Sequence, residues 1–301
     1  MVEKNMKNCR LCNSTKNKII YNGPIRSAGV GSETTNGFEI IECLGCNLVQ
    51  IFPIPENLDS FYETEEYRSK FDLNFDPGSI HKKYDHEQNE RISRIGVQNI
   101  RNKVVLDLGA SAGVFLDSIQ SLAFETIAVE PASIYSEYLK SRKHKYYPYP
   151  EDALNDNIKA DIVTCFDVIE HLSDPRLLLK NAFDLLKPGG LFVLSMPNLN
   201  DFLRKIKPED FESFFFMKVH LNYFSKEVVE KVFKEFDFSN LKVDFLHKYG
   251  IENMLGWAKY GKPGYASEFE GVFDRFANSN FSLNLERLGI SSHLFITATK
   301  K

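Results

Sequence analysis

The sequence predicts an α/β fold in which a seven-stranded, mostly parallel sheet has helices on both faces and a small ribbon precedes it. Three observations support this prediction. Apolar strand-like runs alternate with helical segments after residue 103, and two C-x-x-C pairs occur in the first 46 residues. With 43% hydrophobic residues, the 301-residue chain can also bury a sizeable core. We expect a ribbon at 1–55, a helical linker or cap at 56–102 and the α/β domain at 103–301.

Four of the five cysteines form two C-x-x-C pairs, with thirty residues between the pairs. They are Cys9, Cys12, Cys43 and Cys46. Each pair offers two thiolates from one tight turn, and two such turns complete a tetrahedral S₄ zinc site. Disulfides are the alternative, which a reducing compartment disfavours. The β-prone stretches 18–21 and 38–42 suit a zinc ribbon, so the pattern predicts a structural zinc.

Prolines at positions 53 and 55 indicate the exit from the ribbon. Segments 56–72 and 79–100 then have helical periodicity with mixed charges. We expect these helices to bridge the two parts and cover a ligand site, with plain solvated helices as the alternative.

The first strand of the α/β domain reads Val-Val-Leu-Asp-Leu and runs into the small-residue loop Gly-Ala-Ser-Ala-Gly, which ends at residue 113. The strand delivers Asp107, and Gly109 lets the backbone approach a ligand closely. A second strand ends in Glu130, where a carboxylate can accept hydrogen bonds from both hydroxyls of a ribose. This arrangement predicts a nucleotide-binding turn.

Further strands are expected near residues 146, 162 and 191, and the runs 241–247 and 293–299 are candidates for a closing pair. Alternation with helices indicates that most of these strands are parallel. Residues 248–292 contain the only tryptophan and are long for a loop. This insertion is either a functional lid or contact surface, or a helical embellishment packed on the core.

The ordered motifs resemble the class I S-adenosylmethionine-dependent methyltransferases, which have a Rossmann-like fold. Residues 107–113 stand where that family has D-x-G-x-G-x-G, although Ser111 replaces the middle glycine, and Glu130 stands at the ribose acid. Segments 161–175 and 185–198 are similar to the fourth strand and the Gly turn before the fifth. Residues 220–225, His-Leu-Asn-Tyr-Phe-Ser, are similar to the H-L-x-x-F-S of a branch that often modifies sugars and other small hydroxylated molecules.

The resemblance implies S-adenosylmethionine as cofactor, with its methionine end over the glycine loop, its ribose on Glu130 and its adenine near Asp152. Glu151 is the alternative adenine partner. Phe166 lies near the same mouth, where core packing is its simpler role. The implied cofactor residues are Asp107, Gly109, Ala110, Ser111, Gly113, Glu130, Pro131, Asp152 and Asp167.

Candidate catalytic groups follow the fourth and fifth strands, because ligands bind beyond the carboxyl ends of parallel strands. We expect His220 to accept the proton of the methyl acceptor, with His171 and Glu170 beside it. Structural roles for both histidines are the alternative. A second alternative is Mg²⁺ at Asp167, Glu170, His171 and His220, since similar E-x-x-E-H runs bind a divalent ion in some O-methyltransferases. Here Asp167 replaces the first glutamate and is one methylene shorter.

The expected function is methyl transfer to a hydroxyl, or less readily a carbon or amine, of a small molecule. A sugar or nucleotide-linked sugar in polysaccharide biosynthesis is the acceptor we expect, because similar zinc modules occur in methyltransferases that act on nucleotide-linked sugars. An RNA methyltransferase and a non-catalytic cofactor-binding module are the alternatives. The net charge of −4 disfavours a nucleic-acid partner. The polar first residues and the lack of an 18-residue apolar run predict a cytoplasmic protein without membrane insertion.

Overall fold

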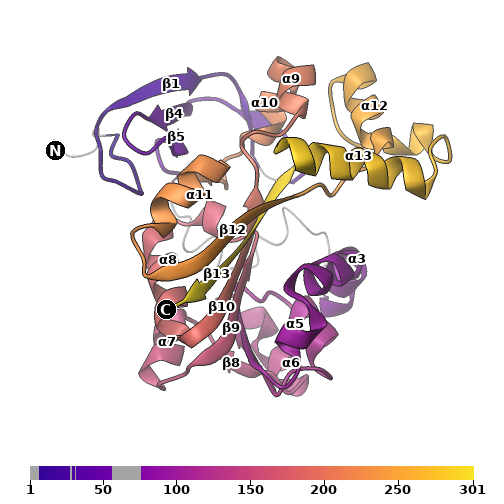
Figure 1. Cartoon of the computed structure of the whole chain (residues 1–301). Helices are drawn as coiled ribbons and strands as arrows, with labels where there is room; N and C mark the ends of the chain where they lie inside the picture. Colours follow the sequence, from indigo (N-terminus) through magenta and orange to yellow (C-terminus); the bar gives the residue numbers. More distant parts are fainter. Residues whose placement is uncertain (1–6, 28, 31, 56–75) are drawn as a thin grey trace.

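The computed structural model describes residues 7–27, 29, 30, 32–55 and 76–301, so the expected helix at 56–72 lies outside the described residues. A seven-stranded sheet with the order β12-β13-β10-β9-β6-β7-β8 forms its centre (Figure 1). Strands β10, β9, β6, β7 and β8 are parallel, and β13 is antiparallel to both of its neighbours. The predicted fold class is confirmed. The strands are β6 Val104–Leu108, β7 Glu125–Val129, β8 Lys145–Tyr147, β9 Ala160–Phe166, β10 Leu186–Pro197, β12 Phe238–Leu246 and β13 His293–Lys300.

Helices cover both faces of this sheet, because successive side chains of a buried strand point to opposite sides. In β6, Val105 packs into one apolar cluster with residues of α3 and α5, whereas Leu106 packs into another with residues of α8 and α11. The helices of the first layer are α3 Pro77–Ile95, α4 Val97–Ile100, α5 Val114–Ile119, η1 Ser133–Tyr135 and α6 Ser136–Ser141. Those of the second layer are α7 Pro150–Asn155, α8 Pro175–Leu185 and α11 Lys226–Phe233.

A smaller, antiparallel sheet contains the N-terminal strands, in the order β1-β4-β5-β11. Strands β1 Asn17–Tyr21 and β4 Glu39–Cys43 confirm the two β-prone stretches, and β5 Val49–Phe52 is a further strand that was not predicted. The fourth strand, β11 Asn222–Tyr223, comes from the segment that resembles H-L-x-x-F-S. A short hairpin of β2 Ile25–Arg26 and β3 Thr34–Thr35 lies beside this sheet. The ribbon is therefore joined to the rest of the chain by strand pairing.

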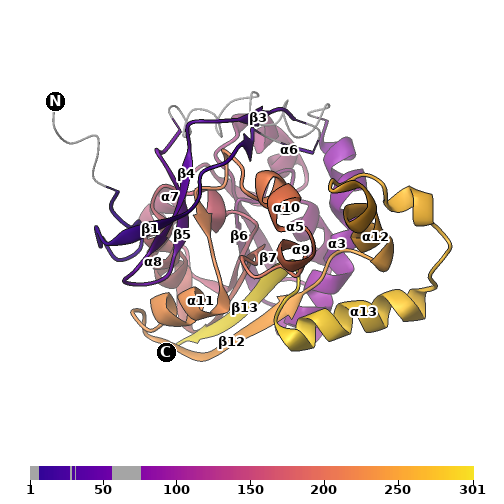
Figure 2. The same cartoon turned by 90° about the horizontal axis from the view of Figure 1, so that it is seen from above.

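The insertion at 248–292 contains α12 Ile251–Tyr260, η3 Ala266–Phe269 and α13 Arg275–Leu288. Figures 1 and 2 show α12 and α13 at one side of the molecule. Trp257 is only 2% exposed, and its ring lies 5.1 Å from that of Phe211 in α10 Pro208–Phe215, which follows α9 Leu203–Ile206. The insertion is thus helical and packs on α9 and α10 through apolar side chains. Within the described chain, no helix combines the length and apolar character needed to cross a membrane.

Candidate functional site

The two C-x-x-C turns have the same backbone geometry. Cys9 and Cys43 each accept a hydrogen bond at their carbonyl from the asparagine four residues later, at 2.9 Å in both turns. Those residues, Asn13 and Asn47, both have left-handed backbone angles, with φ of 57° and 71°. Asparagine tolerates this conformation better than most residues. Each turn therefore presents two sulfur atoms on the same side.

The four sulfur atoms of these turns face one another. The Sγ atoms of Cys9 and Cys46 lie 3.4 Å apart, as do those of Cys12 and Cys43, and all four lie within 4.8 Å of one another. A tetrahedral zinc site with Zn–S bonds of about 2.3 Å requires sulfur separations of about 3.8 Å. None of the cysteines forms a disulfide. The donor set and its spacing fit a structural zinc.

The loop after β6 keeps its backbone open for a ligand. Gly109 has a φ of +79°, and a Cβ atom there would lie 2.5 Å from a methyl group of Val168. Ser111 also has a positive φ, +52°, so the position of the missing glycine retains a left-handed conformation despite the side chain. Gly113 has a φ of +77° and begins α5, where a Cβ would lie 2.8 Å from Leu139. Gly113 thus serves helix packing.

Glu130, which follows β7, lies against this loop with only 3% of its surface exposed. Its two carboxylate oxygens accept hydrogen bonds from the backbone amides of Ser111 at 2.7 Å and Ala132 at 3.0 Å. Backbone donors on both of its oxygens therefore hold this carboxylate at the glycine loop. The structure therefore fits the expected ribose acid.

A cavity of about 530 Å³ opens at the carboxyl ends of β6, β7 and β9. Its volume falls in the range of small-molecule and cofactor sites. Most of the expected cofactor residues line it. They are Asp107, Gly109, Ala110, Ser111, Glu130, Pro131 and Asp167, whereas Gly113 and Asp152 are not among the lining residues.

Glu151 lines the end of the cavity that is expected to hold adenine. The Asp152 carboxylate instead accepts a hydrogen bond from the amide of Tyr149 at 3.2 Å and caps α7. Capping uses one of its oxygens inside the helix turn. Tyr149 and Pro148 complete this end of the cavity. Glu151 lines the cavity where Asp152 does not, and its own Oε1 accepts a hydrogen bond from the side-chain amide of Asn181 at 2.8 Å.

Two aspartates of the cavity have opposite electrostatic environments. Burial raises the pKa of Asp107 to about 7, although its carboxylate accepts a hydrogen bond from the Thr164 hydroxyl at 2.6 Å. Burial alone would also raise the pKa of Asp167, but the charges of Lys248, His293 and Arg91 hold it well below its usual range. Asp167 is therefore ionised at neutral pH, whereas the pKa of Asp107 lies close to neutral pH.

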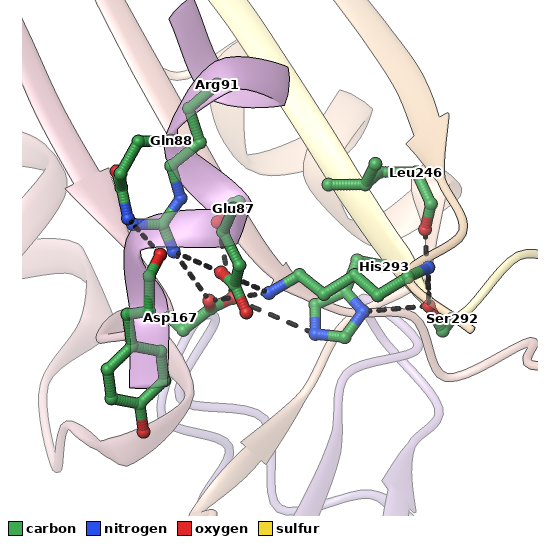
Figure 3. Close-up of polar contacts among 10 residues, drawn as sticks. Glu87, Gln88, Arg91, Asp167, Leu246, Ser292 and His293 are labelled. Carbon is green, nitrogen blue, oxygen red and sulfur yellow. Dashed lines mark hydrogen bonds and ion pairs between the residues drawn. The ribbon is translucent and has the colours of Figure 1, made fainter. Parts of the chain in front are cut away.

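Figure 3 shows Asp167 at the centre of a polar network between α3, β9 and the start of the insertion. Its carboxylate lies 3.1 Å from the Lys248 ammonium and 3.4 Å from the Arg91 guanidinium. Both cations also contact Glu87, at 3.2 Å and 2.9 Å. His293 lies 4.0 Å from Asp167. The two cations balance the negative charges of Asp167 and Glu87. The network also joins α3 to the carboxyl edge of the sheet.

The sequence analysis did not identify Arg91, Lys248 or His293. A signal was present for two of them, because Lys248 follows one expected edge strand and His293 begins the other. An antiparallel pair that closes the sheet places the end of one strand beside the start of the next, at the carboxyl edge of β10. Arg91 carries no comparable signal, since it lies inside a long polar helix.

The expected catalytic groups Glu170, His171 and His220 come together, with their ligating atoms within 4.8 Å of one another. The rings of the two histidines are 4.7 Å apart and edge-on. Glu170 lies in η2 Ile169–His171 and is 2% exposed, and its Oε2 atom has no hydrogen-bond partner in the part of the chain that the structure describes. Of the three residues, His171 lines the cavity. Asp167, the fourth ligand of the magnesium alternative, lies outside this cluster and binds cations instead.

The protonation states of this cluster follow from burial. Burial, His171 and the charge of Arg26 together lower the pKa of His220 well below its ordinary value, so its imidazole is neutral at neutral pH. Burial and the charge of Asp167 raise the pKa of Glu170 well above the ordinary value of a glutamate. His171 Nδ1 lies 2.9 Å from the carbonyl of Val219. A carbonyl cannot donate, so Nδ1 carries a proton, and Nε2 is the acceptor when the ring is neutral.

Residues 80–243, more than half of the chain, match the family model described as a methyltransferase domain. Among curated proteins, the chain is 26% identical over 138 residues to a ubiquinone biosynthesis O-methyltransferase of Psychrobacter cryohalolentis, covering 42% of this chain and 52% of that protein. It is 30% identical over 155 residues to the mitochondrial ubiquinone biosynthesis O-methyltransferase of Candida albicans, covering 48% and 45%. The chain thus spans about half the length of these relatives.

Among solved structures, the fold is similar to a SAM-dependent methyltransferase from Archaeoglobus fulgidus, with a TM-score of 0.50 at 18% identity. The superposition covers 73% of this chain and 94% of the other. At this identity the similarity concerns the fold, in agreement with the strand order of the central sheet.

Proposed function

The chain belongs to the methyltransferase domain family, and on this basis we propose that it transfers a methyl group from S-adenosylmethionine to a hydroxyl of a small molecule. We further propose a sugar or nucleotide-linked sugar as the acceptor. The observation that carries the cofactor assignment is the pairing of the Gly109 loop with the buried Glu130 carboxylate at the mouth of one cavity. The names of the curated relatives support oxygen as the methylated atom.

The cofactor would be held by the open loop from Gly109 to Ser111, by Glu130 and by Glu151. When bound, S-adenosylmethionine supplies an activated methyl group on its sulfonium. The chain itself must then align an acceptor and receive one proton.

Two residues are proposed to handle that proton. His171 lines the cavity, and its Nε2 is an acceptor because Nδ1 donates to Val219. His220 packs against the His171 ring and stays neutral, so it does not repel a proton arriving at His171. We therefore propose His171 as the group nearest to the reacting hydroxyl and His220 as its partner or a direct acceptor contact.

The magnesium alternative makes a different demand on the same residues. A divalent ion at Glu170, His171 and His220 would require Glu170 to ionise, and the unpartnered Oε2 of Glu170 is the observation that keeps this alternative open. Without an ion, burial raises the pKa of this carboxyl and so disfavours its ionised form.

The acceptor side is proposed to include the N-terminal ribbon. Strand β5 pairs with β11, two residues after His220, and the amide of Ile51 donates to the carbonyl of Leu221 at 3.1 Å. Arg10 also donates to that carbonyl, at 2.8 Å. These contacts support a role of the ribbon in shaping the acceptor site.

The test is a methyl-transfer assay with labelled S-adenosylmethionine and a panel of nucleotide sugars, read by mass spectrometry of the products. Removing a general base costs about two to four orders of magnitude in turnover, so His171→Ala and His220→Ala should show losses of this size with unchanged cofactor affinity. His86→Ala, an exposed histidine of α3, is the matched control. Activity that EDTA abolishes and Mg²⁺ restores, where zinc does not, would favour the ion. No methylation of any acceptor despite cofactor binding would favour a non-catalytic module.

A further inference from the structure

Arg26 in the β2–β3 hairpin is a charged side chain whose surroundings in the described chain contain no acidic partner within ion-pair distance. Its guanidinium carbon lies 4.0 Å over the ring of Phe214, and Nη2 lies 3.1 Å from the Met217 sulfur. The Nε atom is buried without a hydrogen-bond acceptor. A thioether is the only acceptor this guanidinium has among the described residues, and thioethers are weak acceptors.

Burying an arginine in this environment costs free energy of folding unless a ligand supplies the missing hydrogen-bond acceptors. Burial lowers the pKa of Arg26 to about 10, so the side chain is still charged at neutral pH. A partly buried charge loses hydration that only a counter-charge or hydrogen bonds can replace. The cavity cations differ in this respect, because Arg91 and Lys248 each contact both Glu87 and Asp167.

The backbone places Arg26 beside the proposed acceptor site. Its amide donates to the carbonyl of Phe216 at 3.0 Å, and its carbonyl accepts from the amide of Lys218 at 2.9 Å. The same segment continues into His220, whose amide donates to the Met217 carbonyl at 3.0 Å. The charge of Arg26 also helps to lower the pKa of His220. The ribbon thus brings a cation that has no acidic partner among the described residues close to the histidine cluster.

We propose that Arg26 binds an oxyanion group of the methyl acceptor, a phosphate or a carboxylate, and so determines acceptor specificity. This inference rests on the proposed function and narrows its substrate class. A guanidinium offers a planar fork of N–H donors that matches both groups, and the ring of Phe214 supports the opposite face of that fork. The ribbon would then hold the charged part of the acceptor while the cavity holds the cofactor.

The experiment uses the full zinc-loaded chain saturated with S-adenosylhomocysteine. Inorganic phosphate and acetate are titrated separately, and binding is followed by ³¹P line broadening and by saturation-transfer NMR. Because hydrogen bonds between charged groups are strong, Arg26→Gln should weaken binding of the preferred anion by about tenfold or more. Arg26→Lys should recover part of that affinity, since it keeps the charge but loses the fork. Arg101→Gln, at an exposed arginine after α4, is the matched control and should behave as wild type.

Each outcome decides the proposal. Saturable binding of either anion that Arg26→Gln weakens supports it, and the stronger anion identifies phosphate or carboxylate. Absence of binding by the wild-type protein, or equal binding by the Arg26→Gln variant, overturns it. Zinc content and S-adenosylhomocysteine affinity are measured in the same samples, so a misfolded variant is recognised. If S-adenosylhomocysteine itself fails to bind, the result contradicts the proposed function and not the role of Arg26.

Discussion

Replacing Glu130 with alanine tests the cofactor assignment, because this carboxylate serves both the loop and the expected ribose. In the ligand-free chain its oxygens accept from the amides of Ser111 and Ala132, at 2.7 Å and 3.0 Å. In the proposed complex, two ribose hydroxyls would donate to the same carboxylate. The variant should therefore lose loop stability and cofactor affinity, and the two losses are measured separately.

The size of each loss follows from the number of bonds removed. A hydrogen bond to a charged group contributes about 1.5–3 kcal/mol. Water can replace the acceptor at the partly exposed Ser111, whereas Ala132 is 1% exposed and its amide would stay unsatisfied. We expect the free energy of unfolding to fall by about 2–3 kcal/mol. Loss of the ribose bonds should weaken cofactor binding at least tenfold, since about 1.4 kcal/mol corresponds to a factor of ten.

Calorimetric titration with S-adenosylhomocysteine measures the affinity, and denaturant unfolding followed by circular dichroism measures the stability. Glu130→Gln is informative as a second variant. Whichever way its amide is oriented, the NH₂ group faces one of the two backbone donors, so only one loop bond is retained. Glu125→Ala is the matched control, because Glu125 is an exposed glutamate at the other end of β7.

A folded Glu130→Ala protein that binds S-adenosylhomocysteine as tightly as wild type would refute this reasoning and place the nucleotide elsewhere. An equal loss of affinity in the Glu125→Ala control would show that the effect is not specific to the loop.

Three further predictions concern the ribbon and the two aspartates. Cys43→Ser should lose the single zinc expected per chain and lower the unfolding midpoint, and a fully folded wild-type protein without zinc by metal analysis would contradict the site. Lys248→Met removes one of the cations around Asp167, and we expect the free energy of unfolding to fall by about 2 kcal/mol. Breaking a buried ion pair with no other partner costs about 3–5 kcal/mol, and the loss is smaller here because Arg91 still contacts Asp167. The folded pKa of Asp167 is lowered, so its contribution is complete above the unfolded value of about 3.9 and is lost as pH falls below it. Acid unfolding of Lys248→Met should accordingly begin at a higher pH than that of wild type, and identical acid transitions would count against the network. The pKa of Asp107 in the folded chain is raised to about 7, so ionisation of this carboxyl disfavours the folded chain. The free energy of unfolding should therefore fall as pH rises from about 4 to about 7. Asp107→Asn should flatten that slope, and an unchanged slope would assign the titration to another group.

The central fold was predictable because its signals are local and repeated. Each parallel strand is a short apolar run, and each is followed by a segment with helical periodicity or a capping residue, such as the Asp174 carboxylate that accepts from the amides of Arg176 and Leu177. Strand β11 had no such signal, since two residues are too few to show a period. Its pairing with β5 depends on residues more than 170 positions apart in the sequence.

The candidate site was predictable where a motif lies on one strand and its following turn. The Gly109 loop, Glu130 and the four cysteines belong to this class. Contacts between distant elements were not predictable from such motifs, as with Arg91, which reaches Asp167 from a helix 76 residues away. Local competition also mattered, because the carboxylate of Asp152 caps its own helix while the neighbouring Glu151 lines the cavity.

The pairing of β5 with β11 joins the ribbon directly to residues 220–225, where we propose that the acceptor binds. Coupling between two binding sites is reciprocal at equilibrium, so an acceptor that orders residues 220–225 should raise the zinc affinity by the same factor by which zinc raises the acceptor affinity. The loop at Gly109 and the Glu130 carboxylate directly follow β6 and β7, which pair with strands of the central sheet and not with the ribbon. A chain deprived of zinc should therefore retain its cofactor and lose its acceptor, so that metal supply would control methylation without a dedicated regulatory site.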